Sequence, residues 1–216
     1  MSLSSQVISV NLGSSREVSF GGKTITTGFF KEPILGSAEV GLMGLEGDQQ
    51  ADLTVHGGKD KAVYAYPKEH YASWHALLDG APLPPGSFGE NLTTEGYIET
   101  EIFIGDVLRV GETLLRVTQP RSPCFKLQFR FQRPDAVALF VKQGFPGWYT
   151  SVVRTGRIGR DDHIEIVDRR QSRVSIADVW SLSFQRSANP EEWRWIEGLV
   201  FLPDFWKERI YRSANA

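Results

Sequence analysis

Short apolar runs separated by glycine turns fill the first two thirds of this 216-residue chain. Closely spaced runs of this length, with Gly-Asp and Gly-Glu turns, are typical of antiparallel strands and are too short for buried helices. The pattern therefore predicts a mainly β fold, an antiparallel barrel or sandwich. The runs occupy residues 6–11, 62–66, 102–111, 114–118, 148–153 and 163–167, with the last two joined by a turn at Thr155-Gly156.

Two stretches with helical spacing interrupt these strands, at residues 67–78 and 134–143. A proline near the start and a glycine after the end mark the boundaries of each stretch. Both are predicted to pack over the barrel. His70 and His75 in the first helix are expected to be packing or surface residues, since neither has cysteine or acidic partners at ligand spacing.

Three further short helices are predicted after residue 173. Ser175 is a suitable cap for the first, Asn189 before a proline opens the second, and Pro203 before an aspartate opens the third. We expect a barrel domain over residues 1–170 and a three-helix extension over residues 171–216.

The aromatic residues of this extension are too numerous for so short a segment to bury alone. They are expected to pack on each other, on the barrel, or across an interface between two copies. The extension is thus predicted to form a homodimer interface or a lid over a pocket. The residues are Trp180, Phe184, Trp193, Trp195, Phe201, Phe205 and Trp206.

The overall charge excludes some classes of partner. The chain has 24 Lys and Arg against 26 Asp and Glu, a formal net charge of -2, which offers no general attraction to nucleic acid or to an acidic membrane. A single cysteine cannot form an internal disulfide, and the first residues lack the features of a secretory signal. No apolar run approaches the roughly 20 residues that cross a bilayer. A cytoplasmic protein is expected.

The single cysteine, Cys124, lies in the sequence Pro-Arg-Ser-Pro-Cys-Phe-Lys directly after a predicted strand. Prolines stiffen this turn, and Arg121 and Lys126 favour the charged thiolate, which suits a metal ligand or a nucleophile. A lone cysteine is also common as a small buried hydrophobic residue. Both interpretations remain open from the flanking residues alone.

Residues 44–61 concentrate glycine, acidic residues, His56 and two lysines beside an apolar strand. Gly57 and Gly58 can present backbone amides to an anion, and nearby lysines add positive charge for a phosphate. A tight hairpin with solvated lysines would have the same composition. A second candidate, Asn91, stands between a loop and a strand and offers both donor and acceptor atoms, although an isolated asparagine is often a turn former.

Four ordered motifs together resemble the MOSC domain family, named for the C-terminal domain of molybdenum-cofactor sulfurase. The resemblance spans about residues 40–168 and is closest to stand-alone bacterial members of the YiiM type, which carry a small helical extension. The motifs are Gly44-Leu45-Glu46-Gly47-Asp48 continuing to His56-Gly57-Gly58 and Lys61, then Phe88-Gly89-Glu90-Asn91-Leu92, Ile104-Gly105-Asp106, and Pro120-Arg121-Ser122-Pro123-Cys124-Phe125-Lys126.

The resemblance implies a β-barrel with packing helices and a polar pocket that holds a molybdenum cofactor, Mo-molybdopterin. Cys124 would be the protein ligand to the metal, and soft thiolate ligation suits this chemistry. Arg121 and Lys126 would hold the anionic cofactor, and Asn91 would bond to the pterin or its phosphate. The pocket would also be lined by His56, Gly57, Gly58 and Lys61.

The resemblance also implies reduction of N-hydroxylated compounds, such as hydroxylaminopurines or amidoximes, to amines. Asp48 or His56 is the candidate proton donor, although a carboxylate in a glycine loop often serves as a turn or cap residue. The chain has no flavin or iron-sulfur motif, so electrons are expected from a partner reductase.

Two other functions remain open at this point. In the first, Cys124 carries sulfur as a persulfide and passes it to a metal centre or a biosynthetic enzyme. In the second, the pocket is a non-enzymatic binding module for an anion or pterin, and Cys124 only packs.

Overall fold

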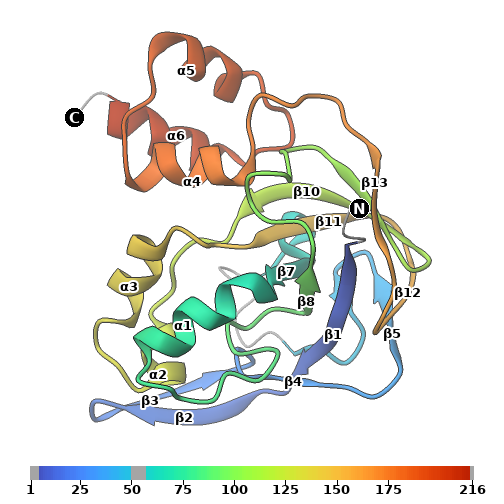
Figure 1. Ribbon diagram of the computed structural model, residues 1–216, viewed down its shortest axis with the longest axis vertical. Helices are drawn as coiled ribbons and strands as arrows, with labels where there is room; N and C mark the ends of the chain where they lie inside the picture. Colours follow the sequence, from blue (N-terminus) through green and yellow to red (C-terminus); the bar gives the residue numbers. More distant parts are fainter. Residues whose placement is uncertain (1–4, 50–56, 215–216) are drawn as a thin grey trace.

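A curved eight-stranded sheet forms the centre of the protein in a computed structural model that describes residues 5–49 and 57–214 (Figure 1). Neighbouring strands pair antiparallel, except for β7 and β8, the fifth and sixth strands in the order given next, which pair parallel. In sheet order, the strands are β13 (Ile164–Asp168), β9 (Val107–Val110), β10 (Thr113–Pro120), β11 (Trp148–Arg154), β7 (Val63–Pro67), β8 (Leu92–Glu95), β1 (Gln6–Gly13) and β4 (Lys31–Pro33).

The two ends of this sheet curl toward each other. β4 pairs only with the last residues of β1, which leaves the start of β1 available to other partners. Gln6 forms an antiparallel bridge with His163, and the Ile164 amide donates to the Ser5 carbonyl over 2.8 Å. These bonds bring the sheet close to a closed barrel, in which few strand edges stay unpaired. The predicted mainly β, barrel-type fold is confirmed.

Two smaller sheets extend the barrel. In one, β5 (Ser37–Gly41) pairs with β6 (Gly44–Leu45) and with β12 (Gly156–Gly159); in the other, β2 (Arg16–Phe20) pairs with β3 (Lys23–Thr27). The β2–β3 hairpin lies along the lower edge of Figure 1.

Short helices cover one side of the barrel, as predicted (Figure 1). The 3₁₀ turn η2 (Lys68–His70) leads into α1 (Tyr71–Leu77), α2 (Lys126–Phe131) follows β10, and α3 (Ala136–Gln143) comes next. Trp74 of α1 is fully buried against Phe88 and Phe140, at ring-centroid distances of 5.2 and 6.1 Å. This aromatic contact joins α1 and α3 to the loop before β8.

The three predicted C-terminal helices are present as α4 (Ile176–Phe184), α5 (Pro190–Glu197) and α6 (Asp204–Ala214). Ser175 and Asn189 each form a capping box, in which cap and third helical residue satisfy each other's backbone amides. No helix in the described part of the chain is long and apolar enough to cross a bilayer.

The aromatic residues of the extension pack on each other and on the barrel side, two of the arrangements expected from the sequence. Trp206 lies 6.2 Å from Phe184, and Trp180 lies 5.7 Å from Phe140 of α3, measured between ring centroids. Both tryptophans are almost completely buried. The extension therefore shares its core with the rest of the molecule.

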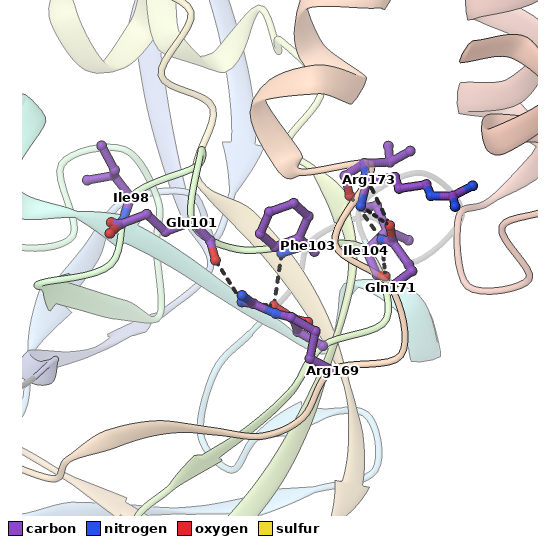
Figure 2. Close-up of polar contacts among 9 residues, drawn as sticks. Ile98, Glu101, Phe103, Ile104, Arg169, Gln171 and Arg173 are labelled. Carbon is purple, nitrogen blue, oxygen red and sulfur yellow. Dashed lines mark hydrogen bonds and ion pairs between the residues drawn. The ribbon is translucent and has the colours of Figure 1, made fainter. Parts of the chain in front are cut away.

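A polar clasp holds the segment that precedes these helices (Figure 2). The Arg169 guanidinium donates to both carboxylate oxygens of buried Asp106, over 3.0 and 2.7 Å, and to the Glu101 carbonyl over 2.8 Å. The Gln171 side chain donates to the Ile104 carbonyl over 2.8 Å. The segment before α4 is therefore anchored to the barrel, while the division into two domains stays a prediction.

Two stretches differ from the predicted strands. Residues 102–111 were expected to form one strand, but only β9 is regular, because the chain turns at Gly105 with a φ of 92°. The turn is fixed by the Phe103 amide, which donates to the Asp106 carboxylate over 3.0 Å. The expected turn at Thr155-Gly156 is instead the start of the short strand β12.

Candidate active site

A cavity of about 70 Å³ opens where the end of β10, the start of α2 and several loops meet. Five of the nine residues predicted for the site line it, namely Lys61, Asn91, Arg121, Cys124 and Lys126. The structure thus brings together residues from three of the sequence motifs. The other lining residues are Gly28, Phe29, Lys31, Gln49, Tyr64, Gly89 and Tyr149.

Asp48, Gly57 and Gly58, although predicted for the site, are not among the residues that line the cavity. Asp48 contacts two lining residues from behind, and Gly57 and Gly58 directly precede the 3₁₀ turn η1 (Lys59–Lys61). Gly58 has a φ of 96°, a conformation that suits glycine. His56 falls outside the described residues, so its predicted role is not addressed by the structure.

Cys124 lies in the turn between β10 and α2. The Leu127 amide donates to the Cys124 carbonyl over 3.1 Å, so the cysteine opens the first turn of the helix. Its side chain is partly exposed and belongs to the cavity wall. This position gives a ligand in the cavity access to the sulfur, which a thiol inside the core would not offer.

Arg121 is a buried cation in the cavity wall. Its guanidinium donates to the Phe88 carbonyl and lies over the rings of Phe29 and Tyr64, 4.9 and 5.1 Å from their centroids. Burial alone would lower the pKa of Arg121, but the phenol oxygens of Tyr64 and Tyr149 raise it above its ordinary value. The residue therefore supplies a permanent positive charge in a fixed orientation.

Lys31 and Asp48 form a buried ion pair beside the cavity, with side chains 8% and 3% exposed. The Lys31 ammonium donates to both oxygens of the carboxylate, which also accepts from the Gly13 amide over 2.8 Å. Desolvation lowers the pKa of Lys31, although Asp48 opposes this effect. The pair places a charged ammonium at the cavity without leaving it unpaired.

Asn91 is held by hydrogen bonds at both ends of its side-chain amide. Its Nδ2 donates to Asp48 over 2.9 Å, and its Oδ1 accepts from the Tyr64 amide over 3.1 Å. Because these partners differ in donor and acceptor character, the amide has a defined orientation. Asp48 therefore orients two lining residues, Lys31 and Asn91.

Glu90 is a buried carboxylate that shapes the loop before β8. It accepts from the Gly86 amide over 2.8 Å, from the Phe88 amide over 2.9 Å and from the Tyr71 hydroxyl. Desolvation raises the pKa of Glu90, although these hydrogen bonds oppose it. The carboxylate fixes the loop that carries Gly89 and the Phe88 carbonyl to the cavity.

The charges of the lining fit an anionic ligand. Four of the lining residues, Lys31, Lys61, Arg121 and Lys126, are cationic, and none of those that belong to the described ranges 5–49 and 57–214 is acidic. Burial lowers the pKa of Lys61, with Asp60 acting in the opposite direction. A cavity of this charge attracts phosphate groups, and Cys124 adds a soft sulfur donor. This donor set fits a phosphate-bearing cofactor that carries a thiophilic metal.

Several residues of the site carried little signal in the sequence. Lys31 follows two phenylalanines and lies outside the recognised motifs, so only the fold shows that it pairs with Asp48. Phe29 and Tyr149 likewise reach the cavity through the barrel topology. Glu90 lies inside a recognised motif, and that position was the signal that could have drawn attention to it. Its role as a loop organiser required the hydrogen-bond pattern.

Within residues 5–49 and 57–214, no group of three or more His, Cys, Asp or Glu side chains could hold a metal ion by itself. His70 is instead paired with Glu99 over 2.7 Å in the interior, in agreement with its predicted packing role.

Comparisons with known proteins place this cavity in a family context. YflK, an uncharacterized protein of Bacillus subtilis, is 36% identical over 209 residues, which cover 97% of this chain and 94% of that protein. Protein YiiM of Escherichia coli is 37% identical over 176 residues, with coverage of 79% and 76%. A protein of Gibberella moniliformis named Reductase is 34% identical over 80% of this chain, but over only 31% of its own length.

The fold shows the same relationship. The crystal structure of YiiM from Geobacillus stearothermophilus matches with a TM-score of 0.80 and 30% identity, covering 97% of this chain and 99% of that one. The family model described as MOSC domain matches residues 52–165, more than half of the sequence. This span includes η1, the loop before β8, and the turn with Cys124. The chain therefore belongs to the MOSC domain family.

Proposed function

We propose that this protein binds a molybdenum cofactor in the cavity and reduces N-hydroxylated compounds to amines. The observation that carries the proposal is the cavity itself, which is lined by four cationic residues and by Cys124. The relative named Reductase supports an oxidoreductase within this family.

Different residues of the cavity would bind different parts of such a cofactor. Cys124 would provide the thiolate that contacts the metal, while Arg121 and Lys126 would bind the phosphate or other anionic parts. Lys61 would approach from η1, and the oriented amide of Asn91 would bond to the pterin. When bound, the cofactor supplies two-electron transfer to the substrate.

The reaction consumes protons, and the structure suggests a route for them. Conversion of a hydroxylamine to an amine takes two electrons and two protons and releases water. Asp48 is one of the two candidate proton donors predicted from the sequence, but both its oxygens already accept hydrogen bonds from Lys31, Asn91 and Gly13. A proton exchanged between Asp48 and a ligand in the cavity would therefore pass through the Nζ of Lys31.

The electron donor belongs to the same proposal. A partner reductase is expected to deliver electrons, since the sequence has no motif for a flavin or an iron-sulfur cluster. The small net charge gives no reason to expect nucleic acid as a partner. A cytoplasmic location and a homodimer, both expected from the sequence, complete the proposal.

The test is an assay on protein made in a host that synthesises the cofactor. A chemical reductant replaces the unidentified partner, and an amidoxime and a hydroxylaminopurine serve as substrates. The wild type and Ser122→Ala, a control in the same turn but outside the cavity lining, should form amine, while Cys124→Ser should form none. The proposal would be contradicted if Cys124→Ser formed amine at the wild-type rate. It would also be contradicted if neither the wild type nor Ser122→Ala formed any amine.

A further inference from the structure

Two consecutive hydrogen bonds connect α6 of the extension to the turn that carries Lys61. The indole Nε1 of Trp206 donates to the Oε1 of Gln119 over 3.0 Å, and the Nε2 of Gln119 donates to the Asp60 carbonyl over 3.2 Å. Trp206 is fully buried and Gln119 nearly so. The link therefore spans from the helical extension, through β10, to η1.

The Gln119 amide can serve this link in only one orientation. An indole nitrogen can only donate, and a backbone carbonyl can only accept. The amide oxygen must therefore face Trp206 while the amide nitrogen faces Asp60. If Trp206 lost its N–H, the orientation of Gln119 would no longer be fixed by a partner on that side.

The Asp60 carbonyl lies at the centre of the turn that brings Lys61 to the cavity. It also accepts from the Thr118 hydroxyl over 2.6 Å, and the Lys61 amide donates to the Gly58 carbonyl over 3.0 Å. Within η1, Lys59 and Asp60 are exposed. Two hydrogen bonds from β10 thus reach a single carbonyl of this turn and help to hold it to the barrel.

We propose that the helical extension positions the cationic turn of the cavity through Trp206 and Gln119. Trp206 does not line the cavity, so it acts as a positioning residue for Lys61. The extension is then a working part of the anion site, in addition to any role at an interface. The inference rests on the proposed function only for the identity of the anion.

The protein offers a closely matched pair of variants. Trp206→Phe removes the indole N–H that orients Gln119 and retains most of the buried ring. Trp180→Phe makes the same change at a neighbouring buried tryptophan whose Nε1 has no hydrogen-bond partner in the described part of the chain. Any loss of stability from the smaller ring should be similar in the two variants.

Hydrogen–deuterium exchange of residues 57–62 measures how firmly the turn is held in place. Trp206→Phe should raise the exchange rate of the Lys61 amide about fivefold, the equivalent of one net hydrogen bond, while Trp180→Phe should leave it unchanged. Gln119→Glu, which keeps an acceptor for Trp206 but loses the donor to Asp60, should show the same local effect. Unchanged exchange in a folded Trp206→Phe, or equal increases in both tryptophan variants, would overturn the inference.

A second measurement separates this inference from the proposed function. Where the wild type retains molybdenum, Trp206→Phe should lose it several-fold faster on dialysis than Trp180→Phe does. Equal rates of loss would count against the positioning role. If the wild type binds no molybdenum, the proposed function fails, while the exchange experiment still decides the positioning role.

Discussion

At the scale of single residues, the buried ion pair of Lys31 and Asp48 has the largest expected effect on the structure of the cavity. Asp48 is the common partner of an ammonium, a side-chain amide and a backbone amide. A buried charge that loses its partner keeps its desolvation penalty. The carboxylate therefore stabilises the fold and orients the cavity through the same contacts.

Replacing Asp48 with asparagine should lower the free energy of unfolding by about 3 to 5 kcal/mol, because Lys31 would remain buried without its counterion. Glu32→Gln is the control, since the Arg16–Glu32 pair is exposed and should contribute less than about 1 kcal/mol. Denaturant unfolding of the two variants measures the difference. Equal effects would show that the buried pair has no special weight.

Glu90 predicts a dependence of stability on pH. Burial raises its pKa above the ordinary value of 4.5, so between these two pKa values the folded protein binds more protons than the unfolded chain does. The contribution of Glu90 to stability is therefore full below pH 4.5 and is lost as the pH rises through the folded pKa.

The comparison with Glu90→Gln isolates this contribution, since all other titrating groups are shared. The free-energy gap between wild type and variant should be largest in acid and should narrow as the pH rises toward neutrality. Unfolding in urea at several pH values measures the gap. A gap that widens with rising pH would mean that Glu90 is held ionised in the folded state.

The role of a single residue was predictable only where the residue lies in a recognised motif and its type suggests a specific chemistry. Cys124 was singled out by its place in a motif that resembles the MOSC family, whereas its flanking proline and cations alone left a packing role open. Lys31 was not predicted, because it lies outside the recognised motifs and its burial beside Asp48 depends on the pairing of β4 with β1. Asp48 stands in a recognisable motif, but its partners were not predictable.

At the scale of elements, the loop before β8 controls the shape of the cavity. Gly89 has a φ of 77°, and a Cβ at this position would lie 2.9 Å from the ring of Phe29. Gly22 has a similar φ of 75°, with nothing within 4 Å of its Cβ position. Comparing alanine substitutions at these two glycines therefore separates the cost of backbone strain, which both share, from the cost of the clash with Phe29, which only Gly89 has.

Gly89→Ala should destabilise the protein more than Gly22→Ala does. Both variants carry the left-handed backbone penalty of about 1 to 2 kcal/mol, but only Gly89→Ala must also displace Phe29, at a further cost of about 1 to 3 kcal/mol. Thermal unfolding measures both. Identical losses of stability would mean that Phe29 moves aside freely and does not shape the cavity.

Local sequence signals predicted the elements where boundary residues and periodicity agree. Ser175 and Asn189 marked helix starts, and both form the expected caps. The six-residue helix α2 escaped prediction because it is too short to show a period. The strand expected from residue 102 was interrupted, because the Asp106 carboxylate holds a turn whose partners lie in the segment before α4.

At the scale of the whole molecule, the barrel and the helical extension should unfold together. They share a buried aromatic contact between Trp180 and Phe140, the Trp206–Gln119 hydrogen bond and the hydrogen bond from the Gln171 side chain to the Ile104 carbonyl. A continuous core favours one cooperative transition. The strands, the C-terminal helices and packing of the extension on the barrel as one of three arrangements were predictable from the sequence, whereas the individual contacts that join the two parts required the structure.

Denaturant unfolding followed by tryptophan fluorescence and by far-ultraviolet circular dichroism should therefore give coincident transitions. Fluorescence is weighted toward the extension, which holds four of the six tryptophans, while circular dichroism reports on all elements. Two separate transitions would instead support independent domains over residues 1–170 and 171–216.

The central claim is that the cavity holds a molybdenum cofactor through Cys124. Elemental analysis of wild type and Cys124→Ser, both purified from a host that makes the cofactor, tests it most directly. The account predicts stoichiometric molybdenum in the wild type and its loss in the variant. Molybdenum absent from both proteins, especially with a persulfide on Cys124 detected by intact mass, would contradict it and favour sulfur transfer.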